Sequence, residues 1–370
     1  MSKVSSKSKP QAKKPGAAGR QNGWAVNYLE LLNQELPPPS KHKKRKYKAL
    51  DLFAGCGGLA LGFEAAGFHT VGYEMLADAC ETYSSNLAGA CHQLVLEPGQ
   101  ELTDEAHVVI GGPPCQPFSV GGLQNGRQDK RDGFPAFIWA VQHYQPDLAM
   151  FENVRGMLYR NKKYFDHIAD ELRGLGYVVE WQLLNSVDYG VPQRRERLFV
   201  VAHRGSWNFP APINFGRYFT AGDALGDLAF QVDENTKFLT KSMDEYVARY
   251  EKKSFCARPR DLHLDQPSRT VTCRNLNGAT GDMLRVRLPD DRRKRLTVRE
   301  GARLQSFPDW FEFCGSDGSQ FNQVGNAVPP LLAKAIAGSV LQYLESGERL
   351  SSDEINQLNS VPSGQMSFDL

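Results

Sequence analysis

The fold is decided by one stretch of sequence, KALDLFAGCGGLALGFEAAG, residues 48–67. An apolar run at 48–53 leads into Gly55 and Gly57, and an apolar helical pattern follows at 58–67. A strand, a glycine-rich turn and a helix in this order are typical of a parallel sheet whose turn offers main-chain N–H groups to a ligand. The pattern alone fits two other cases equally well: a tight turn without a ligand, or the nucleotide loop of an NAD(P)-dependent oxidoreductase.

The alternation of strands and helices continues beyond this stretch. Further strands are predicted near 69–74, 107–111, 147–152, 178–184 and 197–202, and further helices near 77–88, 134–144 and 163–174. The segment 204–266 breaks the alternation, and helical patterns resume at 296–307 and 329–345. The sequence therefore predicts an α/β fold with a doubly wound, mostly parallel sheet and one small irregular insert.

Composition narrows the class of protein. The 370 residues are 41% hydrophobic and 23% charged, and they contain no long apolar run, so we expect a globular cytoplasmic protein without a membrane span or signal peptide. The seven cysteines show no CxxC spacing, so neither a disulfide framework nor a metal site is expected.

Charge is distributed unevenly. Residues 1–48 hold 12 lysines and arginines and two acids, which leaves 32 basic and 40 acidic residues in 49–370. A nucleic-acid ligand would therefore need local basic surfaces on the body, and the candidates are 258–303 and QRRER, 193–197. Such runs are also common on ordinary solvated faces. We expect residues 1–24 to be disordered and 24–36 to form a short amphipathic helix.

Several chemically active residues follow predicted strands and so should meet at one edge of the sheet. Glu74 ends the second strand, where a carboxylate could accept hydrogen bonds from a ribose, and GGPPCQPFS (111–119) and ENVRG (152–156) follow later strands. The glycines and prolines hold Cys115 on a stiff loop, although most free cysteines are inert core residues. Only His203 among the histidines ends a predicted strand, so a cysteine hydrolase is disfavoured.

Taken together, these motifs resemble the DNA (cytosine-5)-methyltransferase family of bacterial restriction–modification systems. The matching motifs, in order, are DLFAGCGG, GGPPCQPFS, ENVRG, QRRERLFVV, RLTVREGARLQSFPD and QVGNAVPPLLAKAIA. The resemblance covers 48–203 and 267–345. It implies the S-adenosylmethionine-dependent methyltransferase fold, S-adenosyl-L-methionine as cofactor and double-stranded DNA as partner.

The resemblance also implies roles for catalytic residues. Cys115 would add to carbon 6 of a cytosine flipped out of the DNA helix, which makes carbon 5 able to accept a methyl group. Glu152 would contact N3 and the exocyclic amine, Arg197 would hold O2, and Arg195 would support the base, phosphate or thiolate. The Gly-rich segment 119–132 resembles the family's loop that closes over the flipped base.

Binding positions carry over in the same way. The cofactor positions are Phe53, Gly55, Gly57, Leu59, Glu74, Met75, Pro114, Asn326 and Ala327. The DNA-binding positions are Gln116, Ser119, Arg258, Arg260, Thr270 and Arg274. Two departures affect the adenine pocket: Gln93–Leu94 stand where the family often has an acid, with Glu97 off register, and DGFPAF replaces the usual Gly-x-Leu-Phe.

These assignments divide the chain into five parts. They are a basic, largely disordered arm (1–47), a catalytic and cofactor-binding domain (48–203), a target-recognition region (204–278), a segment that completes that region and returns to the catalytic domain (279–345), and a flexible tail (346–370). We expect a monomer associated with the bacterial nucleoid. The rival functions are methylation of cytosine in tRNA, which another branch of the family performs, an NAD(P)-dependent oxidoreductase, and a non-catalytic DNA-binding module.

The last residues, GQMSFDL (364–370), resemble the peptide by which bacterial replication and repair proteins bind the sliding clamp. Gln365 precedes Met366, Phe368 and Leu370, whose alternating spacing suits an extended peptide with side chains entering pockets. The alternative is a frayed tail or one that folds back on the body.

Overall fold

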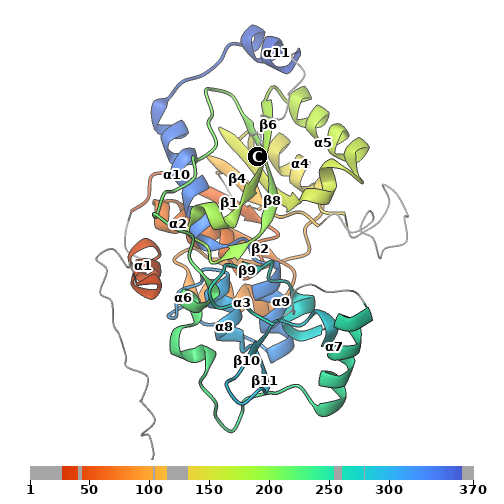
Figure 1. Ribbon diagram of the computed structural model, residues 1–370. Helices are drawn as coiled ribbons and strands as arrows, with labels where there is room; N and C mark the ends of the chain where they lie inside the picture. The colour runs from red at the N-terminus through yellow and green to blue at the C-terminus, as the bar shows by residue number, and fades with distance from the viewer. Residues whose placement is uncertain are drawn as a thin grey trace, which may run out of the picture.

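A seven-stranded sheet forms the centre of the protein (Figure 1). The computed structural model describes residues 27–40, 44–102, 105–114, 132–253, 261–278 and 280–360. In the order β3-β2-β1-β4-β5-β8-β6, the strands of the sheet are β3 (Cys91–Gln93), β2 (His69–Glu74), β1 (Lys48–Leu52), β4 (Val108–Gly111), β5 (Leu148–Val154), β8 (Glu196–His203) and β6 (Val178–Asn185). The pairs from β3 to β5 are parallel, whereas β8 is antiparallel to both β5 and β6. The predicted α/β fold with a mostly parallel sheet is confirmed.

Helices cover both faces of the sheet, because alternate side chains of each strand point to opposite faces. In β1, Ala49 packs with residues of α2 (Gly58–Ala66) and α10 (Pro330–Ser346), whereas Leu50 packs with those of α4 (Phe134–Tyr144) and α5 (Lys162–Gly174). The central strands are buried on both sides, which explains their nearly continuous apolar runs. Within the described residues, no single helix is long and apolar enough to cross a membrane. The bent pair α9 (Asp317–Asn326) and α10 reaches the necessary length and apolar content only when the two helices are counted together.

The insert after β8 is built from short elements beside the sheet domain (Figure 1). They are α6 (Ala221–Leu225), α7 (Lys241–Lys253), β9 (Ser268–Arg269), β10 (Arg285–Arg287) and β11 (Arg293–Arg295), and the chain continues into α8 (Val298–Leu304) and α9. β9 pairs in parallel with the two-residue strand β7 (Gln193–Arg194). Buried Arg303 of α8 donates to the main-chain oxygen of Leu225, so the insert is bonded to the segment that returns to the sheet.

The expected N-terminal helix is present as α1 (Tyr28–Glu35), but it does not belong to a disordered arm. Tyr28, Leu32 and Leu36 are buried in the main core. Trp310 donates to the carbonyl of Leu36 at 3.0 Å, and Lys334 forms an ion pair with Glu35 at 2.6 Å. Residues 1–26 lie outside the described part of the chain.

Two further elements differ from the sequence-based expectation. Residues Ser352–Ser360 were expected to be part of a flexible tail but form helix α11, in which Ile355 is buried and Asn359 donates to the carbonyl of Tyr177. The edge strand β3 was not predicted, because its three residues, Cys-His-Gln, make no apolar run. The segment 361–370, including the clamp-like peptide, lies outside the described residues.

Candidate active site

The carboxyl ends of β1, β2, β4 and β5 meet at one edge of the sheet, as expected for parallel strands. The antiparallel strand β8 begins at this edge, where Arg197 pairs with Val154. The edge therefore brings together the glycine loop, Glu74, the loop 111–114 and Glu152 with the start of β8. His203 was expected at the same edge but lies at the opposite one, paired with the first residues of β5 and β6, because β8 runs the other way.

The glycine loop after β1 is tied to the next strand by one carboxylate. Buried Glu74 accepts hydrogen bonds from the main-chain N–H groups of Gly55 at 2.9 Å and Leu76 at 2.8 Å. Gly57 has a φ of 88°, and a Cβ there would lie 2.7 Å from Leu87, so no other residue fits without movement. Phe53 also has a positive φ of 58°, and Leu59 is buried behind the loop.

Cys56 lies inside this loop, but it is not a nucleophile of the cleft. Its thiol is buried and donates to the carbonyl of Gln323, and burial raises its pKa to about 12. A thiol with such a pKa stays protonated near neutral pH, which leaves the cleft's nucleophilic role to another cysteine.

An apolar surface adjoins Glu74 at the end of β2. The side chain of Met75 is 58% exposed, and Leu76 beside it is exposed to a similar extent. Gln93, at the end of β3, donates to the carbonyl of Met75 at 3.4 Å. The register of β2 and β3 places Glu74 opposite Gln93, so the residues at the predicted adenine side are neighbours.

The loop 111–114 is held at both of its described ends. Asn153 donates through Nδ2 to the carbonyl of Pro113 at 3.1 Å, and the N–H of Gly133 donates to the carbonyl of Pro114 at 3.1 Å. These bonds fix the two sides of the segment 115–131, which lies outside the described residues together with the predicted site residues Cys115, Gln116 and Ser119. Sequence reasoning missed the positioning role of Asn153, although this residue stands in the quoted ENVRG motif.

Glu152 and Arg197 form the ion pair at the centre of the site. Arg197 Nε lies 2.9 Å from Glu152 Oε1, and the two side chains are only 14% and 13% exposed. Both residues were predicted from the sequence, and the antiparallel pairing of β5 with β8 brings them together. A partly exposed carboxylate beside a guanidinium can contact both donors and acceptors of a bound base.

Arg195 lies behind this pair and contacts the main chain. Its buried guanidinium donates to the carbonyl oxygens of Val271 at 2.7 Å and Ala327 at 2.9 Å. Burial lowers its pKa to about 9, helped by the charge of Arg197 and opposed by that of Glu152, so it stays protonated at neutral pH. We therefore expect Arg195 to position the segments around Val271 and Ala327 rather than to contact the substrate. Ala327 and the exposed Asn326 end α9 at this point.

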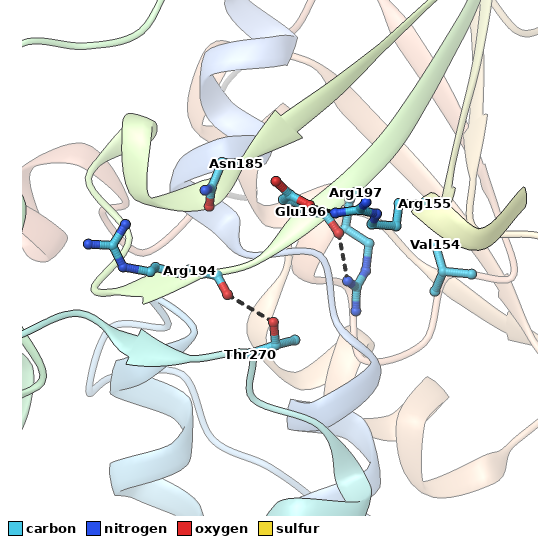
Figure 2. Close-up of a pocket in the computed structure, with 7 residues that line it drawn as sticks. All are labelled: Val154, Arg155, Asn185, Arg194, Glu196, Arg197 and Thr270. Atoms are coloured by element: carbon cyan, nitrogen blue, oxygen red, sulfur yellow. Dashed lines mark hydrogen bonds and ion pairs between the residues drawn. The ribbon is translucent and has the colours of Figure 1, made fainter. Parts of the chain in front are cut away.

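Beside the ion pair lies an open pocket of about 370 Å³ (Figure 2). Its lining residues are Val154, Arg155, Asn185, Arg194, Glu196, Arg197 and Thr270. Thr270, a predicted DNA contact, donates to the carbonyl of Arg194 at 2.8 Å. Arg194 belongs to QRRER, a candidate basic surface, whereas no role was expected for Arg155 of ENVRG or for Glu196.

The basic stretch 258–303 is not a continuous DNA-binding surface. Arg285, Arg287 and Arg293 all contact Asp261, and buried Lys294 contacts Glu300 at 2.8 Å. These four cations are therefore structural. Arg274 is exposed at the start of the turn Arg274–Gly278, whereas Arg258 and Arg260 lie outside the described residues. No group of three or more potential metal ligands occurs among the described residues.

Comparison with known proteins agrees with this arrangement. Residues 47–342 match the family described as C-5 cytosine-specific DNA methylase. The chain is 60% identical over 321 residues to the Type II methyltransferase M.AplI of Arthrospira platensis, a match that covers 87% of this chain and 93% of that protein. It is 37% identical over 333 residues to the Type II methyltransferase M1.HphI of Haemophilus parahaemolyticus, covering 79% and 86%.

Solved structures show the same fold. The Dnmt2 methyltransferase of S. pombe superposes with a TM-score of 0.63 at 17% identity, over 81% of this chain and 99% of that one. The Dnmt2 of Spodoptera frugiperda gives a TM-score of 0.61 at 18% identity, over 81% and 100%. Family, relatives and site geometry lead to one conclusion: the chain belongs to the C-5 cytosine-specific DNA methylases and is a DNA cytosine methyltransferase.

Proposed function

We propose that this methyltransferase is the modification enzyme of a restriction–modification system and acts on a cytosine flipped out of double-stranded DNA. The observation that carries the proposal is the Glu152–Arg197 pair, which lies at the sheet edge beside the loop leading into Cys115. A base inside a duplex cannot reach this edge, so the target nucleotide has to leave the helix. The Type II methyltransferases M.AplI and M1.HphI support the assignment to a restriction–modification system.

The residues at the ends of β1 and β2 fit S-adenosyl-L-methionine. The Gly55–Gly57 turn leaves main chain accessible, the Glu74 carboxylate can accept from a ribose, and the exposed Met75 can cover an adenine ring. Phe53, Leu59, Pro114, Asn326 and Ala327 would complete this site. When bound, the cofactor supplies the methyl group.

The chain's own residues make cytosine reactive. The thiolate of Cys115 adds to carbon 6 and forms a carbon–sulfur bond, while Glu152 supplies a proton at N3 so that negative charge does not build on the ring. Carbon 5 then behaves as an enamine carbon and accepts the methyl group. Arg197 donates to O2 and holds the ring in place. The N3 proton returns to Glu152 as carbon 5 is methylated, and loss of the carbon-5 proton to a base then restores the double bond and releases Cys115 as the thiolate.

Sequence recognition is assigned to the region 204–278 and its continuation from residue 279. Thr270 would contact a phosphate near the flipped nucleotide, and its place in the pocket wall supports this role. Arg258, Arg260 and the exposed Arg274 would read base edges in the major groove.

The proposal is tested by methylation assays with defined nucleic acids. Purified protein and tritiated S-adenosyl-L-methionine should label duplex DNA and leave tRNA unlabelled. Bisulfite sequencing of DNA from cells expressing the protein should show one methylated sequence context. Labelling of tRNA in preference to DNA would contradict the assignment and support the rival function in the same family.

We also propose that the enzyme acts as a monomer near the nucleoid and that its C-terminal peptide binds the sliding clamp. Such tethering would raise the local concentration of enzyme on newly replicated DNA. Fluorescence anisotropy of a labelled 360–370 peptide with purified clamp tests this. Binding should be lost in a peptide carrying Gln365→Ala and Phe368→Ala, and equal binding of both peptides would refute it.

A further inference from the structure

The pocket beside the catalytic pair carries two arginines that the catalytic mechanism does not use. Arg155 follows β5 in the 3₁₀ helix Arg155–Leu158, and Arg194 ends β7. Both side chains are exposed, and Figure 2 draws them on opposite sides of Glu196. Two cations from separate elements therefore border the place where we expect the flipped cytosine.

Arg155 forms an ion pair in which another anion can replace the carboxylate. Its Nη1 lies 2.6 Å from Glu196 Oε2, but the two side chains are 57% and 45% exposed. An exposed ion pair of this kind contributes little to stability and is weakened by salt, so exchange of the carboxylate for another anion costs little. Glu196 thus neutralises Arg155 in the absence of DNA.

Arg194 is fixed through its main chain and leaves its guanidinium available. Its carbonyl accepts the hydroxyl of Thr270, and its guanidinium lies 5.9 Å from the centre of the Tyr218 ring. It forms no ion pair with any carboxylate in the part of the chain that the structure describes. An exposed guanidinium of this kind is suited to bind a phosphate.

The size of the pocket and the charge of a flipped nucleotide suit these two cations. A volume of about 370 Å³ is typical of sites for whole small molecules, so the pocket can hold more than a pyrimidine ring. A flipped nucleotide has one phosphate on each side of its sugar. We propose that Arg155 and Arg194 bind these two flanking phosphates, and that Arg155 exchanges Glu196 for its phosphate when DNA binds. The inference rests on the proposed flipping of cytosine to the Glu152–Arg197 pair beside this pocket.

The first test is the salt dependence of binding to a duplex that contains the methylated sequence. Each phosphate contact contributes about 0.9 to the slope of log K against log salt concentration. Arg194→Gln should lower the slope by about 0.9, and Arg155→Gln should lower it as well. Glu196→Gln should instead tighten binding, because Arg155 no longer has to leave a carboxylate.

Arg349→Gln is the matched control. Arg349 is 43% exposed and pairs with Asp147, which precedes β5 at the opposite edge of the sheet. For Arg349→Gln, the slope of log K against log salt concentration should equal that of the unmodified protein. Unchanged slopes in both pocket variants, or an equal loss in the control, would overturn the proposal.

The second test measures flipping directly. With 2-aminopurine at the target position, the unmodified protein should increase fluorescence as the base unstacks, and both pocket variants should give a smaller increase. A target placed opposite an abasic site costs less to flip, so it should restore the variants. Absence of any increase with the unmodified protein would contradict the proposed flipping itself. A normal increase in the variants would contradict only the role of Arg155 and Arg194.

Discussion

The sheet domain and the outer part of the recognition region are stabilised by different forces. The central strands bury alternate apolar side chains against helices on both faces, as with Val108 and Val109 of β4. Around α7 the described apolar cluster is small: Leu239, Val247 and Met283 are its buried members. The rest of that packing is a network of arginines and carboxylates centred on Asp261.

In this network the carboxylate of Asp261 contacts three arginines on the two strands β10 and β11. Asp261 Oδ1 accepts from Arg285 Nε at 2.5 Å, and Oδ2 lies 3.0 Å from Arg287 and 3.3 Å from Arg293. Arg285 is 0% exposed and also reaches Glu251 of α7 at 3.3 Å. The comparison indicates that the catalytic residues are positioned by a rigid apolar layer, whereas the part of the recognition region around α7 is fixed by directional polar contacts, which specify geometry.

The largest effect is expected in the catalytic half. Glu152→Gln should lower the single-turnover methylation rate by about 10²–10⁴-fold, because the carboxyl group no longer supplies a proton. The choice of methylated sequence should not change, since recognition is assigned to the other half. Glu180→Gln, a change of an exposed carboxylate on β6, is the control and should behave like the unmodified protein. An altered sequence preference in Glu152→Gln would break the division between the two halves.

In the recognition half, Asp261→Asn should destabilise the fold by up to about 3–5 kcal/mol, because buried Arg285 loses its shorter ion pair and the other acid, Glu251, lies 3.3 Å away. Burial alone would raise the pKa of Asp261, but the charges of Arg285, Arg293 and Arg287 outweigh burial and hold it below its usual value. The stabilisation is thus present above the unfolded pKa of about 3.9 and is lost as pH falls through the folded pKa. Hydrogen exchange should accelerate in α7 and β10–β11 and stay slow in the central strands. Asp290→Asn, at an exposed pair with Arg292, should leave exchange unchanged.

A smaller effect is expected at the contact between the two halves, where α9 packs on the chain after β9. Gly325 of α9 packs directly on the chain after β9, where a Cβ would lie 2.1 Å from the nitrogen of Cys273. Gly325→Ala should therefore cost about 1–3 kcal/mol in chemical denaturation and raise KM for DNA, because it separates the segments that Arg195 joins. Gly338→Ala, in open space within α10, should be neutral or stabilising by up to about 1 kcal/mol. Equal effects of the two changes would show that the contact between α9 and the chain after β9 is not tightly packed.

The smallest effect is expected from the basic N-terminal residues. Deleting 1–26 removes six lysines and arginines and no acid, so the salt dependence of DNA binding should become flatter while the methylated sequence stays the same. The deletion has to stop before α1, because Tyr28 and Leu32 belong to the core. A change of the recognised sequence would assign these residues to recognition instead.

The catalytic half could be predicted well from the sequence because its signals are local. Apolar runs bounded by glycines located β1, β2 and β4, and the residues that follow strands gave the catalytic edge. Strand direction has no such signal, so the reversal of β8 and the position of His203 were missed. The arginines of 258–303 illustrate the other limit: their sequence suggests a DNA surface, but only tertiary structure shows that Arg285, Arg287 and Arg293 contact Asp261.

The most direct test of the account is covalent trapping through Cys115. DNA with 5-fluorocytosine at the target position should form a methylated adduct that resists denaturation, because the fluorine at carbon 5 cannot leave as a proton does and the thiolate is not released. The unmodified protein should form this adduct in the presence of S-adenosyl-L-methionine, and Cys115→Ser should form none. An adduct that persists in Cys115→Ser would contradict the assignment of Cys115 as the nucleophile.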